Sequence, residues 1–270
     1  MQDLPSTHDL AKKYNLFAKK SLGQNFLFDY KITDKIVLNS GEIVGKNILE
    51  IGPGPAGLTK SILQSNPKKL IVIEQDCRII PLLEEVQTYY PNNFEIIHGD
   101  ALKIDISKIF GDEKFKISAN LPYNIGTVLV FQWLEKCEKI ESMTLLLQKE
   151  VVQRIISKPN SKNYGRLAVM INSFCNTKSL FDIAPGSFVP APKVTSSLVN
   201  IIPKPTNIDF NILSKICAVA FNQRRKMLRS SLKSLNIDVE NWLKKSNIKP
   251  DLRAEQLSLE DFSNLVKNFK

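Results

Sequence analysis

A glycine-rich loop after the first apolar run of the chain is the clearest place where residue types suggest chemistry. It lies in EIGPGPAGLT at 50–59, where Gly52, Gly54 and Gly57 fit the pattern G-x-G-x-x-G, and the acidic Glu74 ends the next apolar run. In this pattern the glycines let the backbone approach a nucleotide, and the carboxylate accepts hydrogen bonds from ribose hydroxyls. The loop therefore predicts a cofactor that contains a nucleoside.

Two prolines narrow the choice of cofactor. Pro53 and Pro55 each remove a backbone N–H from the loop, whereas a pyrophosphate needs a row of such donors at the start of a helix. S-adenosylmethionine carries an adenosine, a carboxylate and a sulfonium but no phosphate, so it fits the loop better. A nicotinamide-dependent dehydrogenase stays open as the weaker alternative, because the chain shows no obvious acid–base partner for hydride transfer.

Two further polar residues follow apolar runs in the same way. Asp100 comes after FEIIHG and can accept a hydrogen bond from the amino group of an adenine, and Asn120 lies in ANLPYNI at 119–125. Because the carboxyl ends of parallel strands meet at one sheet edge, both residues are expected beside the glycine loop, together with Glu74. ANLPYNI is then either a tight connection or the wall of a pocket for a flat, amide-like substrate.

The apolar runs that carry these residues alternate with helical stretches. The β-type runs cover residues 47–51, 70–74, 94–98, 115–119 and 142–148. This alternation predicts a parallel sheet with helices on both faces. Two later runs, at 179–184 and 196–202, enclose a Pro/Gly-rich stretch and are typical of a strand pair that closes a sheet edge.

The character of the chain changes after the Pro-Lys-Pro stretch at 203–205. Residues 209–270 show helical periodicity and no strand signal, and X-Pro pairs mark boundaries. We therefore expect two domains, residues 1–205 and residues 206–270. The second contains 12 lysines and arginines against 7 acidic residues, which is half of the net charge of +10 in under a quarter of the chain. A small basic helical domain predicts a lobe that holds a polyanion.

Composition limits the remaining classes. The chain has 270 residues, of which 43 % are hydrophobic and 24 % charged, as in an ordinary globular protein. No run approaches the roughly 18 apolar residues of a membrane span, and the N-terminus lacks a signal-peptide pattern. We therefore expect a cytoplasmic protein with no membrane partner. The four cysteines form no Cys-x-x-Cys pair and there are two histidines, which predicts neither a disulfide nor a metal site.

Nine blocks, in this order, resemble the ribosomal RNA adenine N6-dimethyltransferase family. They are SLGQNFL at 21–27, EIGPGPAGLT at 50–59, IEQD at 73–76, HGDAL at 98–102, NLPYNI at 120–125, QKEVVQRI at 148–155, YGRL at 164–167, FVPAPKVTS at 188–196 and FNQRRKMLR at 221–229. The likeness spans roughly residues 12–270. It implies an α/β fold, namely a class I (Rossmann-like) methyltransferase domain with a mostly parallel seven-stranded sheet, followed by a small all-helical C-terminal domain.

The resemblance also implies an activity. The likeness is greatest toward the small-subunit enzymes, which use S-adenosylmethionine to methylate N6 of two adjacent adenosines near the 3′ end of 16S rRNA, giving N6,N6-dimethyladenosine. The implied partner is small-subunit rRNA or the assembling 30S subunit, with a role in subunit maturation, and we expect a monomer. A large-subunit rRNA adenine methyltransferase of the macrolide-resistance type and a non-catalytic RNA-binding assembly factor are the alternatives.

The family likeness carries residue roles onto this chain. The residues expected at the cofactor are Gln24, Asn25, Leu27, Gly52, Gly54, Glu74, Gln75, Asp100, Ala101 and Asn120. The residues expected to hold the target base are Asn120, Leu121, Pro122, Tyr123 and Phe188. One departure stands out: many members have glycine where this chain has Ala56, and its methyl group is expected to crowd the cofactor.

The NLPY residues suit methyl transfer to an adenine N6. The N6 lone pair is delocalised into the ring, so acceptors on its N–H groups are expected to favour attack on the methyl. The Asn120 side-chain carbonyl and the backbone carbonyl of Leu121 or Pro122 are the candidates, and proline fixes the backbone. Tyr123 offers a flat face for the base, and such stacking contributes about 1–3 kcal/mol. Phe188 is expected on the other face of the base.

A basic stretch, FNQRRKMLRSSLKS at 221–234, is expected to lie along a helical segment. It carries Arg224, Arg225, Lys226 and Arg229, which we expect to contact RNA phosphates. A solvated basic face without a partner is the alternative, and a steep fall of RNA affinity with salt would distinguish the two.

Overall fold

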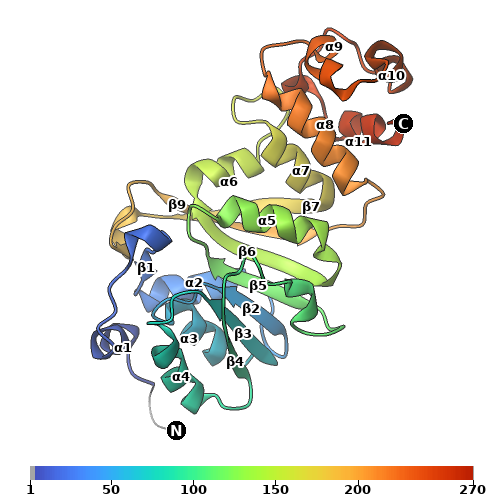
Figure 1. The fold of residues 1–270 in the computed structure, drawn as a ribbon. Coiled ribbons are helices and arrows are strands. Elements are labelled where there is room, and N and C mark those ends of the chain that lie inside the picture. The colour runs from blue at the N-terminus through green and yellow to red at the C-terminus, as the bar shows by residue number, and fades with distance from the viewer. Residues whose placement is uncertain (1–3, 270) are drawn as a thin grey trace. The chain divides into compact units, whose positions relative to one another are not determined.

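The computed structural model describes residues 4–269, in which strands and helices alternate along the first part of the chain (Figure 1). The strands are β1 (Phe26–Leu27), β2 (Asn47–Ile51), β3 (Lys69–Glu74), β4 (Phe94–His98), β5 (Phe115–Asn120), β6 (Ile140–Gln148), β7 (Cys175–Ile183), β8 (Phe188–Val189) and β9 (Ser196–Pro203). The α-helices are α1 (Thr7–Lys13), α2 (Tyr30–Asn39), α3 (Gly57–Gln64), α4 (Ile80–Tyr89), α5 (Gly126–Glu135), α6 (Lys149–Ile155), α7 (Arg166–Phe174), α8 (Phe210–Asn222), α9 (Leu228–Ser231), α10 (Val239–Lys245) and α11 (Leu259–Lys267).

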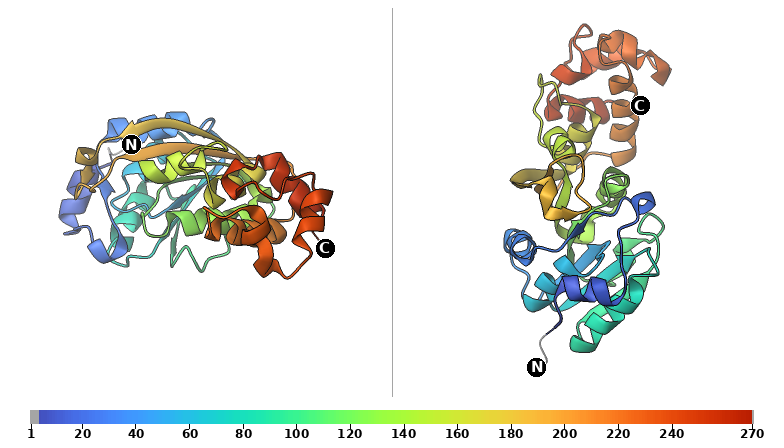
Figure 2. Two further views of the ribbon diagram at one scale, coloured as in Figure 1. Left: turned by 90° about the horizontal axis from the view of Figure 1, so that it is seen from above. Right: turned by 90° about the vertical axis from the view of Figure 1, so that its left-hand side faces the viewer.

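Seven strands form one sheet in the order β4-β3-β2-β5-β6-β9-β7. The pairs β4–β3, β3–β2, β2–β5 and β5–β6 are parallel, and β6–β9 is antiparallel. The predicted mostly parallel seven-stranded sheet is therefore confirmed, and β7 and β9 run side by side at one edge of it (Figure 2). The strand order reverses at β2, with β3 on one side and β5 on the other. Ligands of such sheets bind outside the carboxyl ends of the strands at this point.

The central strands are apolar because both faces of the sheet are covered. All five residues of β2, NILEI, are buried, as are five of the six residues of β3. Parallel strands buried on both faces read as continuous apolar runs rather than alternating ones. For this reason the sequence located these strands to within a residue or two.

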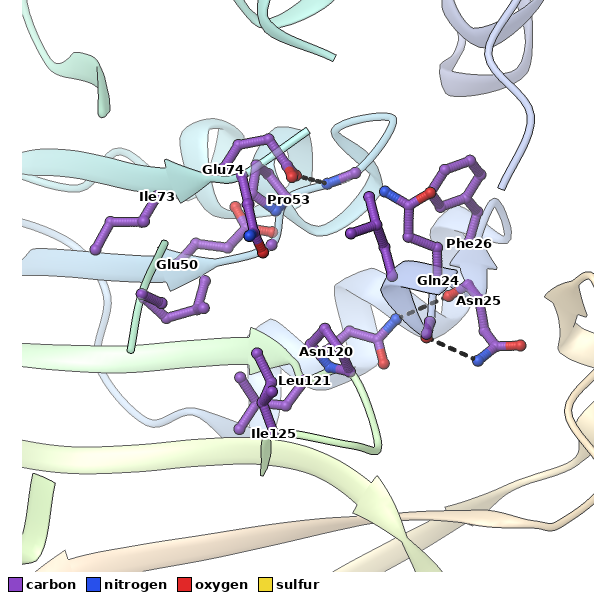
Figure 3. Close-up of a pocket in the computed structure, with 18 of the residues that line it drawn as sticks. Gln24, Asn25, Phe26, Glu50, Pro53, Ile73, Glu74, Asn120, Leu121 and Ile125 are labelled. Carbon is purple, nitrogen blue, oxygen red and sulfur yellow. Dashed lines mark hydrogen bonds between the residues drawn. The ribbon is translucent and has the colours of Figure 1, made fainter. Parts of the chain in front are cut away.

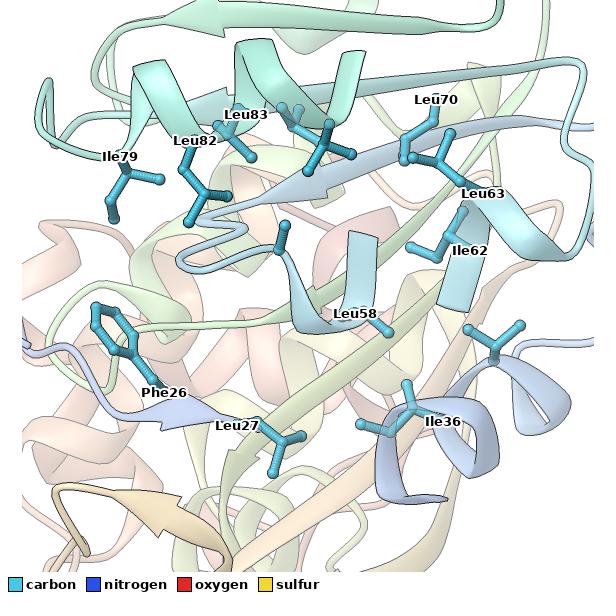
Figure 4. Packing of buried hydrophobic residues seen from close by; sticks show 14 of the residues in the cluster. Phe26, Leu27, Ile36, Leu58, Ile62, Leu63, Leu70, Ile79, Leu82 and Leu83 are labelled. Atoms are coloured by element: carbon cyan, nitrogen blue, oxygen red, sulfur yellow. The ribbon is translucent and has the colours of Figure 1, made fainter. Parts of the chain in front are cut away.

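A hydrophobic cluster joins the N-terminal segment to the helices that follow the strands. Leu27 of β1 and Ile36 of α2 lie near Leu58 and Ile62 of α3, and Leu82 of α4 belongs to the same cluster (Figure 4). These side chains are almost fully removed from water, and each contributes roughly 1.5–3 kcal/mol through its burial. The cluster therefore fixes the start of α3, where the glycine-rich loop ends.

The chain folds into two compact units. The first contains the described residues up to Lys149 together with Lys178–Ile202, and the second contains Glu150–Thr177 together with the described residues from Pro203 onward. The second unit thus takes in most of α6, α7, the loop between them and the first residues of β7, in addition to the predicted helical tail. The expected division of function between residues 1–205 and 206–270 stays a prediction. No helix within residues 4–269 is long and apolar enough to cross a bilayer.

The second unit is held by aromatic packing and one buried hydroxyl. The ring of Phe221 on α8 lies 5.8 Å from that of Phe262 on α11 and 6.3 Å from that of Tyr164. The Tyr164 hydroxyl donates to the carbonyl of Leu257 at 2.9 Å. The helical character predicted for residues 209–270 is confirmed by the helices α8 to α11.

The expected helical segment at 221–234 is interrupted, which corrects the prediction. α8 ends at Asn222, a turn follows, and α9 starts at Leu228. The backbone N–H of Leu228 donates to the carbonyl of Leu252 at 2.7 Å, and that of Arg229 donates to Pro250. These long-range bonds divert the chain, and a local pattern of basic residues does not reveal them.

Candidate active site

A cavity of about 340 Å³ lies at the carboxyl ends of β2, β3, β4 and β5. Its walls are residues 21–27, the glycine-rich loop, the β3 and β4 ends, and residues 120–125 (Figure 3). Every residue that the sequence placed at the cofactor lines this cavity, as do Leu121, Pro122 and Tyr123. The fold therefore brings these residues together, while their individual roles in binding remain predictions.

The glycine-rich loop offers little to a phosphate group. The N–H of Gly52 donates to the carbonyl of Ile73 at 2.9 Å, and that of Ala56 donates to Pro53 at 3.1 Å. The N–H of Gly54 donates to the Glu74 carboxylate at 3.3 Å. Because prolines at the other two positions have no N–H, each position from 52 to 56 is either bonded within the protein or lacks a donor. This loop fits a phosphate-free nucleoside cofactor better than a dinucleotide.

Glu74 is positioned at the cavity by backbone groups. Besides Gly54, the N–H of Asp76 donates to its carboxylate at 2.8 Å. Burial raises the pKa of Glu74, which these backbone bonds partly offset. A carboxylate that lines the cavity with a fixed orientation can accept the two vicinal hydroxyls of a ribose.

Glu50 at the end of β2 is more deeply buried. It is 1 % exposed, and the Thr59 hydroxyl donates to it at 2.7 Å. Burial raises the pKa of Glu50 to about 8, with the neighbouring Glu74 adding to the shift. The protonated form therefore predominates at pH 7, so the cavity floor carries less negative charge than two ionised carboxylates would give.

Asp100 closes a turn at the end of β4 and also lines the cavity. Its Oδ1 accepts the backbone N–H of Leu102 at 3.0 Å. This turn presents Ala101 and Leu102 to the cavity beside the carboxylate. An adenine amino group can donate to Asp100 there, while the apolar side chains cover the ring.

Asn120 is oriented by the N-terminal segment. Its Nδ2 donates to the backbone carbonyl of Asn25 at 3.2 Å (Figure 3). This bond uses the donor end of the amide, so the acceptor end remains for a ligand. The backbone carbonyl of Pro122 already accepts the N–H groups of Ile125 and Gly126 at 3.2 and 3.0 Å. The backbone carbonyl of Leu121 is therefore the better candidate for a second acceptor beside the Asn120 side chain.

Tyr123 is held by a serine that the sequence reading did not single out. Its hydroxyl shares a 2.6 Å hydrogen bond with the hydroxyl of Ser196, the first residue of β9, which is fully buried. Burial raises the pKa of Tyr123. The bond fixes the ring at the cavity wall, where a base could stack on it.

Phe188 lies elsewhere in this structure. It is 3 % exposed, pairs with Leu27 between β8 and β1, and belongs to the hydrophobic cluster rather than to the residues that line the cavity. Its expected place on the second face of the target base stays a prediction, and that role would require its side chain to leave the cluster.

Ala56 adopts the left-handed conformation, with φ of 66°, and is fully buried. A non-glycine residue at such a φ costs of order 1 kcal/mol. Ala56 is not among the residues that line the cavity, although its neighbours Pro55 and Gly57 are. Its methyl group therefore strains the loop rather than filling the space for a cofactor.

The four expected RNA-binding residues differ in their surroundings. Arg224 donates to the carbonyls of Lys162 and Tyr164 at 3.1 and 2.8 Å and pairs with Glu255 at 3.3 Å. Arg225, Lys226 and Arg229 have exposed side chains. The structure thus gives Arg224 a bracing contact within the second unit. RNA contact by the four residues stays a prediction.

Several residues of the site escaped the sequence reading. Ser196 ends the FVPAPKVTS block, but nothing in that pattern indicates its hydrogen bond to Tyr123, which is far away in the chain. Asp76 and Arg78 were part of, or next to, the IEQD block, but their link to residues 17–24 depends on tertiary contact. Among the described residues, no group of three or more His, Cys, Asp or Glu side chains is placed to hold a metal ion.

Comparison with known sequences gives one consistent result. Residues 15–270 match a family model described as ribosomal RNA adenine dimethylase. A protein of Agrobacterium fabrum named ribosomal RNA small subunit methyltransferase A is 46 % identical over 269 residues, which cover 97 % of each chain. A protein of Afipia carboxidovorans with the same name is 45 % identical over 267 residues, covering 97 % of this chain and 95 % of that protein.

Comparison with solved structures agrees with this result. A dimethyladenosine transferase from Plasmodium falciparum is 28 % identical with a TM-score of 0.76, covering 90 % of this chain and 97 % of that one. The 23S rRNA methyltransferase ErmE is 21 % identical with a TM-score of 0.68, covering 90 % and 99 %. At that identity the second likeness shows the fold alone.

Proposed function

Since this chain belongs to the ribosomal RNA adenine dimethylase family, we propose that it transfers methyl groups from S-adenosylmethionine to N6 of two adjacent adenosines of small-subunit rRNA. The product is N6,N6-dimethyladenosine near the 3′ end of that RNA, and the reaction serves small-subunit maturation. The large-subunit alternative is not favoured, because relatives at 42–46 % identity are named small subunit methyltransferases.

The observation that carries the proposal is the orientation of Asn120. Its donor end is bonded to Asn25, and it stands at the end of β5 on the wall of the cavity that the glycine-rich loop and Glu74 also line. A neutral amide at this place can accept from an exocyclic amine without needing a buried charge partner. The arrangement suits an amine as methyl acceptor better than a carbonyl or a phosphate.

The chemical task of these residues is positioning. Bound S-adenosylmethionine supplies an electrophilic methyl group on its sulfonium. Asn120 and the carbonyl of Leu121 would accept the two N6–H groups, which turns the lone pair of N6 out of conjugation and toward the methyl carbon. The new N–C bond would form as the C–S bond of the cofactor breaks, with the electron pair staying on sulfur, and the proton that N6 loses would pass to water. Holding the two reactants in line supplies much of such rate enhancement.

Tyr123 and Pro122 complete the acceptor side. Pro122 limits the backbone freedom of the stretch, and Tyr123, anchored on Ser196, offers its ring to the base. A base stacked on an aromatic ring gains about 1–3 kcal/mol. Because no step needs a strong base, the scarcity of histidine in this chain, with two residues of this type, is no obstacle.

The macromolecular substrate follows from charge and family. With a net charge of +10, the protein favours polyanions, and rRNA is the substrate that the family implies. We place the reaction on the assembling 30S subunit in the cytoplasm, with the protein acting as a monomer. Undermethylated small subunits and protein-free rRNA, compared as substrates, would separate the assembled from the free form.

The test is methyl transfer to undermethylated small subunits, followed by mapping of the modified nucleosides. Asn120→Ala is expected to lower kcat by about 100-fold or more, as loss of a hydrogen-bonding group at a reacting centre does, and to raise the Kd of the cofactor, measured by calorimetry, by a much smaller factor through loss of the bond to Asn25. Asn39→Ala, at a half-buried asparagine at the end of α2 that does not line the cavity, serves as the control. A native rate for Asn120→Ala would overturn the role of Asn120 as an acceptor for N6. Modification of the large subunit would overturn small-subunit rRNA as the substrate.

A further inference from the structure

One wall of the cavity is a segment far from the sheet in sequence, residues 17–27, which we term the cover segment. Residues 21–27 all line the cavity. Figure 3 shows Gln24, Asn25 and Phe26 on one side, with Glu50 and Glu74 on another. The contacts that hold this segment therefore also hold one wall of the cavity in place.

The two ends of the cover segment are held by the body of the first unit. Leu16 just before it is buried in the hydrophobic cluster. At the other end, Leu27 pairs with Phe188, and the carbonyl of Asn25 accepts from Asn120. Residues 17–24 between these anchors need other contacts to stay in place.

Gln24 supplies one such contact through both ends of its amide. Its Oε1 accepts the backbone N–H of Lys19 at 2.7 Å, which folds the segment on itself. Its Nε2 donates to Oδ2 of Asp76 at 3.1 Å, in the connection between β3 and α4. Each end of the amide thus has a partner within the protein, so Gln24 holds the segment in place at the cavity wall.

Arg78 supplies the second contact. Its Nε donates to Oδ1 of Asp76 at 2.9 Å and its Nη2 to Oδ2 at 2.6 Å, a two-pronged ion pair. The same guanidinium donates to the backbone carbonyl of Phe17 at 3.3 and 3.4 Å. Asp76 thus accepts a hydrogen bond from Gln24 within the segment, while Arg78 donates to Phe17 at its start.

Asp76 is suited to accept hydrogen bonds from both Gln24 and Arg78. It is an acidic residue only 4 % exposed, and charged hydrogen bonds of this kind are about twice as strong as neutral ones. The Arg78 guanidinium holds the pKa of Asp76 down at about 2, so the group stays ionised under all ordinary conditions. Its own N–H donates to Glu74, which couples the contact directly to the residue expected at the ribose.

We propose that Gln24, Asp76 and Arg78 form a latch that holds the cover segment over the cofactor site. They are positioning residues: they set how tightly the cofactor is retained without taking part in methyl transfer. Opening the latch would free residues 17–24 while the two anchored ends keep their place. The identity of the cofactor rests on the proposed function, whereas the latch itself rests on the contacts above.

The experiment exchanges the two partners of the central hydrogen bond. Gln24→Glu places a carboxylate next to the Asp76 carboxylate. Asp76→Asn removes the negative charge to which Gln24 and Arg78 both donate hydrogen bonds. Each is expected to raise the Kd of S-adenosylmethionine about tenfold, the loss that a charged hydrogen bond entails. The double variant again has one carboxylate and one amide, which restores the bond between positions 24 and 76 but not the two-pronged ion pair with Arg78, so it is expected to recover part of that affinity.

A second measurement tests whether the effect passes through the segment. Hydrogen exchange of the backbone amides at 17–24 is expected to speed up in both single variants and to slow again in the double variant. Arg78→Lys keeps the charge but loses the fork, and is expected to loosen the same amides even where the Asp76 variants fold poorly. Cys77→Ser, an exposed neighbour in the same connection, is the control and is expected to keep the native Kd.

The outcomes separate the latch from the proposed function. Failure of the wild-type protein to bind S-adenosylmethionine would overturn the proposed function. If wild type binds, the latch is overturned by single variants that keep the native Kd, by a raised Kd with unchanged exchange at 17–24, or by a double variant that recovers no affinity.

Discussion

Glu50 is a buried carboxyl group, and its burial makes the stability of the protein depend on pH. Burial raises its pKa to about 8, against an ordinary value of 4.5. Between these two values the unfolded chain has lost a proton that the folded chain still holds. The stabilising contribution is therefore complete below about pH 4.5 and is lost as the pH rises to 8.

Glu50→Gln is expected to remove this dependence, because an amide does not ionise. Wild type should lose stability between pH 5 and pH 8 with an extra slope of up to about 1.4 kcal/mol per pH unit, and the variant should not. Urea unfolding at pH 5, 6, 7 and 8 measures both. Parallel curves for the two proteins would show that Glu50 ionises normally in the folded state.

The hydrogen bond between Tyr123 and Ser196 makes a second prediction at the scale of single residues. Tyr123→Phe and Ser196→Ala each remove one hydroxyl and leave the other without its 2.6 Å partner. Each is expected to lower kcat/KM about 3- to 10-fold, since a typical hydrogen bond contributes about 0.5–1.5 kcal/mol. The double variant should be no worse than either single one, because both changes break the same bond.

Tyr123→Ala separates the ring from the hydroxyl. Loss of stacking is expected to lower kcat/KM by a further factor of about 10 or more. If Tyr123→Phe were as impaired as Tyr123→Ala, the hydroxyl rather than the ring would carry the function. Strictly additive effects in the double variant would mean that Ser196 does not act through Tyr123.

At the scale of elements, the contact between α3 and β1 depends on the absence of one side chain. A Cβ on Gly57, the first residue of α3, would lie 2.5 Å from the carbonyl oxygen of Leu27. Gly57→Ala must therefore push β1 away from the helix, at an expected cost of about 1–3 kcal/mol. Because residues 21–27 line the cavity, cofactor affinity should fall as well. Urea unfolding and calorimetry measure the two effects.

Gly165→Ala is the matched control for this change. A Cβ at Gly165 would meet nothing within 4 Å, and its φ of −178° suits any residue. Its free energy of unfolding is expected to stay within about 0.5 kcal/mol of wild type. Equal stability of the two variants would mean that β1 and α3 are not in close contact in solution.

The elements also show what the sequence could and could not predict. The inner strands were predictable because burial on both faces makes them continuously apolar, and their carboxyl ends brought Glu74, Asp100 and Asn120 to one cavity by topology alone. The two-residue strands β1 and β8 are too short to have a pattern. The break before Leu228 and the link from Asp76 to Gln24 depend on partners far along the chain, which local patterns do not encode.

At the scale of the whole molecule, the excess of positive charge predicts how RNA binding responds to salt. Each phosphate contact contributes a slope of about −0.7 to −0.9 to log K against log salt. Arg225 is exposed in the turn after α8, so Arg225→Ala is expected to reduce the slope by about one contact and to leave unfolding unchanged. Filter binding of a small-subunit rRNA fragment over a range of salt concentrations measures the slope.

Arg224→Ala provides the contrast. Arg224 is adjacent to Arg225 in the sequence, but its side chain has partners within the protein. The Arg224 guanidinium bonds the carbonyls of Lys162 and Tyr164 and the carboxylate of Glu255. Its removal is expected to destabilise the second unit by about 1 kcal/mol, after allowance for its partial exposure. If Arg224 acts only as this brace, the salt slope should stay at the wild-type value while affinity falls modestly. A slope reduced as much as in Arg225→Ala, with native stability, would instead make Arg224 a phosphate contact that exchanges its internal partners for RNA.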